Sequence, residues 1–369
     1  MRIGFDARLI GFSGAGVYTY NLLRSLLRLD SENSYLVFTN RATYDCVFAS
    51  LNARNSRISS VSASPLTLKH HLWFVGVFLT QHLDVYHYPH FDMPLGQQYP
   101  SVVTVHDLYP ISIAQYCSRE KQYYFRLVVK LNLIKAKKVI AVSEYTKREI
   151  LRHFPVDEEK IRVIYEGVDE SFKNATSTDN KLVRGKFGLK RNFLLYVGNH
   201  KPHKNLTRLL QAYGKLDQKL QKAYDLVITG KMEESDRYSF RIVRELGLGS
   251  RVKFIGFVHQ KDLPGVYRSA TALVMPSLRE GFGLPVLEAM ACGTPVVAAN
   301  TSALPEVAGE ACVFFDPYRT DEMTSAISEV LEDERLRRKL SEMGRKRADS
   351  FSWRETARRT MEVYEEVGG

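Results

Sequence analysis

The sequence predicts an α/β protein with two doubly wound domains, each built on a parallel β-sheet that is covered by helices on both faces. Short, nearly continuous apolar runs recur along the chain and alternate with stretches of helical period, as is typical of parallel strands buried on both faces. The 369 residues are enough for two separate cores. One polar stretch, residues 169–186, interrupts the series without an apolar period, so we expect a linker there.

The first predicted domain comprises residues 1–168 and is joined by a C-terminal helix over residues 353–369, whereas the second comprises residues 169–352. The strands expected in the first domain are Ile3–Ala7, Tyr35–Thr39, Val85–Tyr88, Val102–His106, Val139–Ser143 and Arg162–Tyr165. Those expected in the second are Phe193–Gly198, Leu226–Gly230, Val252–Ile255, Ala272–Pro276, Val296–Ala299 and Cys312–Phe315. Because ligands of such sheets bind beyond the carboxyl ends of the strands, two facing sheets would direct both binding edges into one cleft.

The ends of the chain and its apolar runs indicate no membrane-spanning segment. Residues 1–6 are interpreted as a first strand, because they have neither a long apolar core nor a small-residue cleavage site. The longest apolar run, Leu72–Leu79, has eight residues, whereas a spanning helix needs about 20. The four cysteines are scattered without metal-ligand spacing and are expected to be reduced and mostly buried. We therefore expect a cytoplasmic protein.

More than half of the net charge of +11 comes from one segment: residues 119–138 carry seven basic residues and one acidic residue. Their spacing predicts a basic helix. Its expected inner face consists of Phe125, Val128, Val129, Leu131 and Leu133. Two interpretations stay open: a core helix with a solvated lysine side, or peripheral contact with an anionic surface at the inner face of the cell membrane. Residues 69–79 would add an apolar edge to that contact.

The most informative stretch runs from Pro276 to Pro295. A strand ends at Pro276, a loop with Gly281 and Gly283 follows, and Pro285 suits the first turn of a helix that ends near Gly293. The glycines let the backbone approach a ligand closely, and the free N–H groups at the helix start form an anion site.

Two carboxylates lie beside this anion site, Glu280 on the loop and Glu288 in the expected first helical turn. Ionised carboxylates only accept hydrogen bonds, and each can accept from two neighbouring hydroxyls. The vicinal diols of a ribose and of a sugar are the obvious partners. The alternative is structural: Glu280 caps the loop and Glu288 lies on a solvated helix face.

Several motifs together resemble one enzyme family. Glu280 and Glu288, in the setting Glu-Gly-Phe-Gly-Leu-Pro-Val-Leu-Glu, resemble the donor-binding signature of the retaining GT-B glycosyltransferases of family 4. Val197-Gly-Asn-His-Lys-Pro-His-Lys-Asn205 resembles the family's pyrophosphate loop in the form seen in mannosyltransferase-like members. Further resemblances are Asp6-Ala-Arg8 with Gly11, Gly14 and Gly16, Val105-His-Asp-Leu108, Val142-Ser-Glu144 and Glu166-Gly-Val-Asp169. The resemblance covers nearly the whole chain and implies the GT-B fold, with two Rossmann-like domains facing across a cleft.

The resemblance implies roles for the residues that match. Glu280 would bind hydroxyls of the donor sugar, Glu288 would bind the ribose, and Lys204 would neutralise the diphosphate. His106 would contact the sugar near its 6-position. The backbone N–H groups that would meet the phosphates or the sugar are those of Phe282, Gly283 and Leu284.

The resemblance also places other matching positions near parts of the substrates. Gly14 and Gly16 are expected near the phosphates and the acceptor, and Phe257 and Val258 near the base. Asp107 is the carboxylate next to His106 in sequence and is a candidate catalytic group.

One position of the expected diphosphate-binding site departs from the family pattern. Asn199 stands where the family often has an arginine. Arg8, Lys201 and Arg279 are candidates for that second cation. Because Lys204, the loop amides and the helix start supply positive charge and no Asp-x-Asp motif precedes a strand end, neither a metal nor another cofactor is expected. The histidines His82, His87 and His90 are interpreted as structural.

These observations lead to a retaining hexosyltransferase that uses GDP-mannose or a UDP-hexose and a polysaccharide or lipid-linked saccharide acceptor. A sugar-nucleotide epimerase-type enzyme of the same architecture is one alternative, and a polyanion-binding protein is another. No nucleic-acid partner is expected, because no nucleic-acid-binding motif occurs in the sequence. The oligomeric state is not indicated.

Overall fold

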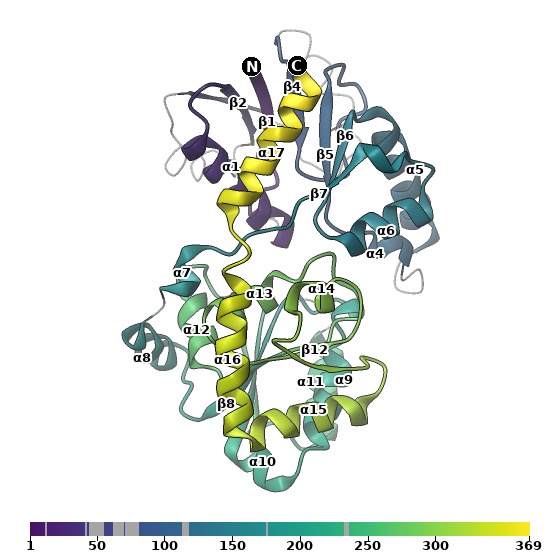
Figure 1. Cartoon of the computed structure of the whole chain (residues 1–369). Helices are drawn as coiled ribbons and strands as arrows, with labels where there is room; N and C mark the ends of the chain where they lie inside the picture. Colours follow the sequence, from purple (N-terminus) through teal and green to yellow (C-terminus); the bar gives the residue numbers. More distant parts are fainter. Residues whose placement is uncertain are drawn as a thin grey trace. The chain divides into compact units, whose positions relative to one another are not determined.

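The computed structural model describes residues 1–11, 13–40, 43, 55–61, 70, 81–112, 118–174, 176–231 and 236–369 (Figure 1). The chain divides into two compact units, one of residues 1–167 with 352–369 and one of residues 168–351. Each unit holds one parallel sheet between helices. The predicted fold class, an α/β protein with two Rossmann-like parallel-sheet domains, is therefore confirmed. The boundaries expected from sequence differ from this division by one residue.

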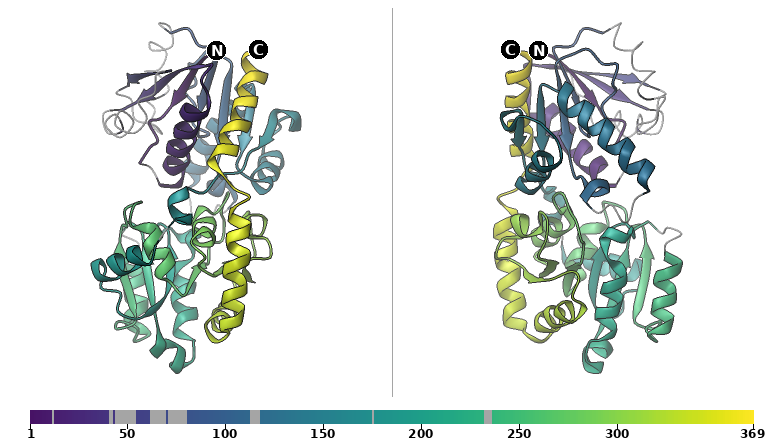
Figure 2. Two further views of the ribbon diagram at one scale, coloured as in Figure 1. Left: turned by 60° about the vertical axis from the view of Figure 1, so that its left-hand side comes forward. Right: turned by 90° about the vertical axis from the view of Figure 1, so that its right-hand side faces the viewer.

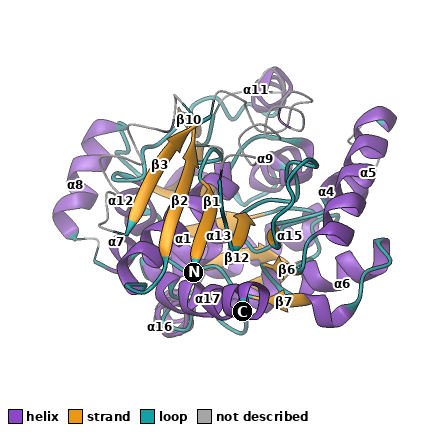
Figure 3. Ribbon diagram, turned by 90° about the horizontal axis from the view of Figure 1, so that it is seen from above, coloured by secondary structure: helices purple, strands orange, loops and turns teal. Residues whose placement is uncertain are grey.

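The sheet of the first unit has seven strands in the order β3-β2-β1-β4-β5-β6-β7, and all neighbouring pairs are parallel. Figure 3 shows β3, β2 and β1 side by side. The strands are β1 (Arg2–Asp6), β2 (Ser34–Thr39), β3 (Ser56–Ser60), β4 (Val85–Tyr88), β5 (Ser101–Val105), β6 (Lys138–Ala141) and β7 (Ile161–Val163). The order reverses between β1 and β4, which makes the carboxyl ends of these strands the ligand-binding edge expected of such a sheet.

The helices of the first unit are α1 (Ser13–Leu29), α4 (Tyr109–Ser112), α5 (Arg119–Lys135), α6 (Glu144–His153) and α17 (Trp353–Gly368), with a short 3-10 turn, η2 (Glu158–Lys160). The last helix, α17, packs along α1 and covers β4 and β5 (Figures 1 and 2). Its residues Trp353 and Tyr364 are buried. The Tyr364 hydroxyl lies 2.6 Å from Nδ1 of His87 on β4, so this helix completes the core of the first unit.

The second unit repeats the arrangement with six parallel strands in the order β10-β9-β8-β11-β12-β13. The strands are β8 (Asn192–Val197), β9 (Tyr224–Thr229), β10 (Val252–Gly256), β11 (Ala272–Met275), β12 (Val296–Ala299) and β13 (Val313–Phe315). The helices are α7 (Glu170–Lys173), α8 (Ser177–Lys186), η3 (Pro202–Lys204), α9 (Leu206–Gly214), α10 (Gln218–Ala223), α11 (Asp236–Glu245), α12 (Leu263–Ser269), α13 (Leu284–Ala291), α14 (Leu304–Ala308), α15 (Thr320–Glu332) and α16 (Glu334–Ala348). Here the order reverses between β8 and β11.

The prediction of a linker over residues 169–186 is wrong, because α7 and α8 occupy most of this segment. Thr176 and Asp179 form a reciprocal capping box at the start of α8, which satisfies two backbone donors that the helix leaves unpaired. Phe172 and Val183 are buried. Two isolated apolar anchors are therefore enough to fold this polar stretch onto the second unit.

The basic helix is present as α5, but one residue of its expected inner face points outward. Phe125, Val128, Val129 and Leu133 are buried, whereas Leu131 is 40% exposed. The buried polar residue of this face is Asn132, whose side-chain amide donates to the carbonyls of Phe91 and Met93. Within the described part of the chain, no helix is long and apolar enough to cross a membrane.

Candidate active site

In the second unit, the switch point between β8 and β11 brings together two of the predicted residues. Lys204 ends the short turn after β8, and Glu280 lies on the loop after β11. Lys204 Nζ is 2.6 Å from Oε1 and 2.8 Å from Oε2 of Glu280. The two side chains are only 16% and 11% exposed. A cation and a carboxylate are thus held together at the strand edge where doubly wound sheets bind their ligands.

Two polar side chains fix the loops that carry Lys204 and Glu280. Asn205, in the left-handed conformation with φ 60°, donates through its side-chain amide to the carbonyls of Pro276 and Pro317, at 3.0 and 2.9 Å. It thereby ties the turn after β8 to the loops after β11 and β13. Ser302 Oγ accepts the backbone N–H of Glu280 at 3.0 Å. Neither residue was predicted to contribute to the site.

The glycine loop leads into α13 as the sequence indicated. Gly283 is the N-cap with φ 104°, and Pro285 lies in the first turn. The positive φ favours glycine, and a Cβ atom on Gly283 would in addition lie 2.7 Å from the side chain of Leu304, which would have to shift. Gly293 follows the helix with φ 73°. Gly281 and Phe282 are buried and Leu284 is half-buried. Pro285 has no N–H, and the N–H groups of Val286 and Leu287 lie 2.9 and 3.4 Å from the Gly283 carbonyl oxygen. Leu284 is the residue of the first turn whose N–H has no carbonyl within the helix.

Glu288 lies one position beyond the first turn of α13, not within it, because the helix begins at Leu284. It is only 7% exposed, so the alternative of a solvated helix face is wrong. The hydroxyl of Tyr267 on α12 donates to Glu288 Oε2 at 2.7 Å. Burial and then the charge of Glu288 raise the pKa of Tyr267 well above its usual value, so this hydroxyl is a permanent donor. Tyr267 was not predicted, because nothing in the local sequence of α12 indicates its partner.

The residues expected near the base differ in their exposure. Phe257 follows β10 directly and is 66% exposed, whereas Val258 is buried. Phe257 therefore offers an aromatic surface at the strand edge, and Val258 belongs to the core. Asn199 is half-buried, and its backbone carbonyl accepts the hydroxyl of Tyr196 at 2.7 Å.

The three candidates for a second cation are not equivalent. Arg8 is fully buried and forms a bidentate ion pair with Asp6, the shortest N–O distance being 2.6 Å. That pair commits Arg8 to the core of the first unit, so it is a poor candidate. Lys201 is exposed and Arg279 is half-buried, and both belong to the same loops as Lys204 and Glu280.

In the first unit, His106 lies directly after β5. Its Nδ1 is 3.2 Å from Oε1 of Glu166, and its Nε2 is 3.0 Å from the carbonyl oxygen of Pro89. Glu166 had been noted as part of a motif but not as a site residue. Asp107 is exposed, and its carboxylate accepts the backbone N–H of Tyr109 at 3.2 Å.

The glycines after β1 are arranged differently from the expected loop. Gly11 has φ 91°, but Gly14 and Gly16 lie in the first turn of α1. A Cβ atom on Gly16 would lie 2.6 Å from the carbonyl oxygen of Leu9, whereas one on Gly14 would meet nothing within 4 Å. Gly16 is therefore required for packing, and Gly14 leaves open space at the start of the helix.

The described cysteines belong to the core, whereas the three histidines interpreted as structural differ: His87 is buried, His90 is half-buried and His82 is exposed. Cys292 and Cys312 are free thiols and buried, and burial raises the pKa of both. Burial lowers the pKa of His87 to about 3. The described residues include no group of three or more His, Cys, Asp or Glu side chains that could hold a metal ion. Cys46, Cys117 and, apart from His70, the segment 69–79 lie outside the described residues.

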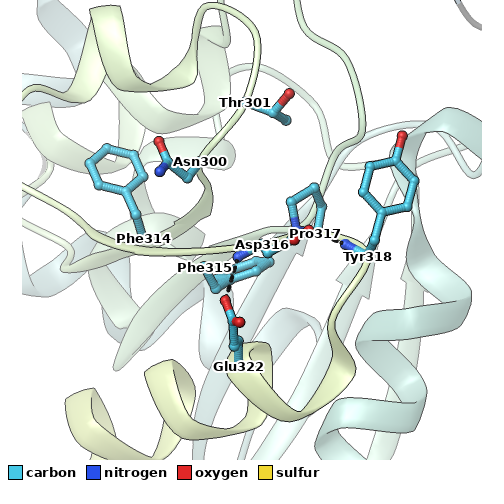
Figure 4. A pocket seen from close by; sticks show the side chains of 8 residues that line it. All are labelled: Asn300, Thr301, Phe314, Phe315, Asp316, Pro317, Tyr318 and Glu322. Carbon is cyan, nitrogen blue, oxygen red and sulfur yellow. Dashed lines mark hydrogen bonds between the residues drawn. The ribbon is translucent and has the colours of Figure 1, made fainter.

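A surface pocket of about 430 Å³ lies at the carboxyl ends of β12 and β13 (Figure 4). Its wall includes Asn300, Asp316, Tyr318 and Glu322. The Asp316 backbone N–H donates to Glu322 Oε2 at 3.3 Å. None of the predicted donor residues lines this pocket, so it is a neighbouring feature of the same sheet edge.

Comparison with known proteins identifies the class. A family model described as Glycosyltransferase Family 4 matches residues 12–172, and one described as Glycosyl transferases group 1 matches residues 178–347. O-antigen chain mannosyltransferase B of Escherichia coli is 31% identical over 281 residues, which cover 76% of this chain and 74% of that protein. The serotype-specific mannosyltransferase WbdA of E. coli is 28% identical over 271 residues, which cover 72% of this chain and 33% of WbdA. The MMP alpha-(1->4)-mannosyltransferase of Mycolicibacterium hassiacum is 32% identical over 62% of this chain and 54% of its own.

Solved structures show the same fold across the whole chain. Sucrose-phosphate synthase from Thermosynechococcus elongatus has a TM-score of 0.83 at 22% identity and covers 99% of this chain and 98% of its own. Anabaena Alr3699/HepE, in complex with UDP and glucose, has a TM-score of 0.81 at 20% identity over 99% of both chains. Fold and sequence together therefore define a glycosyltransferase with two Rossmann-like domains. Within that class, the chain belongs to the group 1 glycosyl transferases of glycosyltransferase family 4.

Proposed function

We propose that this chain is a retaining hexosyltransferase that moves a hexose from GDP-mannose or a UDP-hexose to a polysaccharide or lipid-linked saccharide acceptor. The observation that carries the proposal is the ion pair of Lys204 and Glu280 at the switch point of the second sheet, with Glu288 on the helix that follows the Glu280 loop. Relatives named as mannosyltransferases favour a mannosyl donor and a saccharide acceptor. The neighbouring structure that holds UDP and glucose supports a nucleotide-sugar donor.

The chemistry of these residues suits a donor with two diols and a diphosphate. Ionised Glu280 and Glu288 accept hydrogen bonds from neighbouring hydroxyls, Glu280 from the sugar and Glu288 from the ribose. Lys204 pairs with Glu280, and we propose that its charge also faces the diphosphate of a bound donor. Phe257 offers its exposed ring to the base.

The proposed transfer occurs on one face of the sugar. The bond between the anomeric carbon and the diphosphate oxygen breaks, and the acceptor oxygen forms a new bond to the same carbon. The acceptor proton passes to the departing diphosphate, so no covalent enzyme intermediate is needed. Lys204 and the N–H groups at the start of α13 stabilise the negative charge that develops on the leaving group. These groups let the reaction proceed without a bound divalent metal.

A nucleotide-binding screen tests the donor. GDP, UDP, ADP and a DNA oligomer are compared by the shift they cause in the melting temperature. A nucleoside diphosphate at 100 times its Kd should stabilise the protein by about 2.7 kcal/mol. The best donor is then incubated with saccharide acceptors, and NMR of the product shows whether the anomeric configuration is retained. Turnover should persist in EDTA.

Three results would contradict the proposal in different ways. Stabilisation by the DNA oligomer alone would favour a polyanion-binding protein. Release of nucleotide with a rearranged sugar and no acceptor requirement would favour an epimerase-type enzyme. Inversion of the anomeric centre would overturn the retaining mechanism.

We also propose that the first unit contacts an anionic membrane surface through α5. Four large apolar residues form a stripe on the outer face of this helix: Tyr123, Leu127, Leu131 and Ile134, which are 73%, 45%, 40% and 55% exposed. Their spacing of four, four and three residues keeps them on one side of a helix. Arg126, Lys130 and Lys135 are exposed on the same helix. An apolar stripe with basic neighbours is the pattern of helices that lie on anionic lipids.

Vesicle flotation at low salt tests this contact. Wild-type protein should float with phosphatidylglycerol-containing vesicles and less well with neutral ones, because the basic residues add electrostatic attraction. Leu127→Ser should reduce flotation. Leu182→Ser is the matched control, because Leu182 on α8 is also an exposed leucine, at 67%. Equal flotation of the two variants, or none for wild type, would contradict the proposal.

A further inference from the structure

Tyr267 on α12 is a buried tyrosine that bonds to one of the predicted donor residues. Its hydroxyl donates to Oε2 of Glu288 on α13 at 2.7 Å. Tyr267 is 0% exposed, whereas Glu288 keeps an exposure of 7%. Both residues lie in the second unit. A ligand of this unit can therefore touch Glu288, while Tyr267 has no surface of its own to offer.

The packing around Tyr267 holds its hydroxyl in place. The ring lies edge-on against that of Phe172 on α7, with centroids 5.8 Å apart. The backbone carbonyl accepts the hydroxyl of Thr294 at 2.7 Å. A tyrosine hydroxyl has a single proton to donate, and burial raises the pKa of Tyr267 well above its usual value, so the proton stays on the oxygen. Glu288 therefore faces a rigid and permanent donor.

A rigid donor on one oxygen sets the plane of the Glu288 carboxylate. The last torsion of a glutamate side chain is otherwise broad, and a ligand that has to order a side chain loses affinity. The bond from Tyr267 orders this torsion when the protein folds. Because each oxygen of a carboxylate can accept more than one hydrogen bond, the bond from Tyr267 still allows Glu288 to accept hydroxyls of a ligand.

We propose that Tyr267 is a positioning residue, which orients the carboxylate of Glu288 for the diol of the donor ribose before the donor binds. This inference rests on the proposed function, which assigns the ribose to Glu288. Tyr267 itself touches no part of the donor and acts through Glu288 alone.

Tyr267→Phe removes the hydroxyl and keeps the ring. Isothermal titration should show a Kd for GDP and UDP about 3- to 10-fold weaker, the factor expected for one lost hydrogen bond. Binding of the 2′,3′-dideoxy nucleoside diphosphates should be unaffected, because they have no diol for Glu288 to accept from. The donor KM should change more than kcat, since the ribose is remote from the bond that breaks. An unchanged or tighter Kd for the ribose forms overturns the proposal.

In the Glu288→Gln background, Tyr267→Phe should act in the opposite direction. While Tyr267 is present, the glutamine oxygen accepts its hydroxyl, and the N–H₂ group takes the place of the second carboxylate oxygen. Without that hydroxyl, the amide can turn over and offer its oxygen to the ribose. The double variant should therefore bind GDP and UDP about threefold or more tighter than Glu288→Gln alone. A further loss of affinity in the double variant overturns the proposal, because a purely structural role predicts such a loss.

Tyr213→Phe is the matched control. Tyr213 on α9 is also 0% exposed, and its hydroxyl donates to the backbone carbonyl of Tyr224 at 2.7 Å. The control removes an equally buried hydrogen bond at the start of β9, the opposite end of the strand from the ligand-binding edge. Its melting temperature should fall about as much as that of Tyr267→Phe, while its Kd values should match wild type. An equal loss of affinity in both variants would show a general effect on the fold and overturn the assignment.

The same titrations separate this inference from the proposed function. If wild type binds the ribose and dideoxy forms equally well, the assignment of Glu288 to the ribose fails, and the role of Tyr267 fails with it. If wild type prefers the ribose form and Tyr267→Phe keeps that preference in full, the proposed function stands and only the positioning role is overturned.

Discussion

Glu288→Gln separates binding of the donor ribose from stability of the fold. The Glu288 carboxylate is 7% exposed and accepts a hydrogen bond from the Tyr267 hydroxyl at 2.7 Å. Glutamine has the same shape, and its side-chain oxygen still accepts from Tyr267, so the free energy of unfolding should change by less than about 1.5 kcal/mol. The second carboxylate oxygen is replaced by an N–H₂ group, which cannot accept from a ribose hydroxyl.

The loss in affinity follows from that change. A hydrogen bond to a charged group is worth about 1.5–3 kcal/mol, which corresponds to a Kd about 10- to 150-fold weaker. Isothermal titration with GDP and UDP measures it directly. A sharper comparison uses 2′,3′-dideoxy nucleoside diphosphates: wild type should prefer the ribose form, and Glu288→Gln should lose most of that preference.

Glu149→Gln is the matched control here, because Glu149 has the same 7% exposure but lies in the first unit. It should bind nucleoside diphosphates as wild type does. If Glu288→Gln keeps wild-type affinity and the same preference for ribose, the assignment of Glu288 to the ribose is wrong.

Four further outcomes are expected. Lys204→Ala should lower kcat by about 100-fold or more with a smaller effect on donor Kd, because its charge matters most as the diphosphate leaves; steady-state kinetics and titration with donor check this, and equal losses would contradict it. Phe257→Ala should weaken GDP, UDP and ADP by similar factors, on the order of 1–3 kcal/mol for a lost stacking contact; unchanged Kd values would remove Phe257 from the site. Burial lowers the pKa of both His87 and His203 to about 3, so the unfolded chain takes up protons that the folded chain does not as pH falls below about 6.5. Stability should therefore be complete above pH 6.5 and fall towards pH 4, by at most about 1.4 kcal/mol per pH unit for each histidine, and urea unfolding at several pH values measures it. Gly293→Ala should destabilise the protein by about 1–2 kcal/mol, because φ is 73° and a residue with a Cβ atom is strained in this left-handed conformation; an unchanged melting temperature would contradict this reasoning from the backbone.

The sequence predicted the buried parts of the fold well, because buried parallel strands have a distinct composition. Runs such as Ala272–Met275 and Val296–Ala299 are apolar throughout and form fully buried strands. The edge strand β3 was missed, since its sequence Ser-Arg-Ile-Ser-Ser is mostly polar and half-exposed. Helices α7 and α8 were missed for a related reason: Phe172 and Val183 are too far apart to make an apolar period.

The motifs indicate candidate site residues but not the contacts between them. Lys204 and Glu280 are 76 residues apart, and the motifs that contain them do not reveal that the two side chains pair. His106 and Glu166 are 60 residues apart, on segments that follow β5 and β7. Such pairs depend on the order of strands in the sheet, which fixes the neighbours of each strand end but is not contained in any local pattern.

The return of α17 to the first unit has a consequence for synthesis of the chain. Residues 168–351 form a continuous unit, whereas the first unit needs residues 352–369 as well. Until those residues leave the ribosome, the sheet face beside α1 is uncovered and His87 lacks the hydroxyl of Tyr364. Domains generally fold in the order in which they are translated. Here the second unit is fully translated at Phe351, whereas the first unit still lacks residues 352–369 at that point. A released chain truncated just after Phe351 therefore carries all of the second unit and an incomplete first unit, whose uncovered core is where a chaperone is expected to bind.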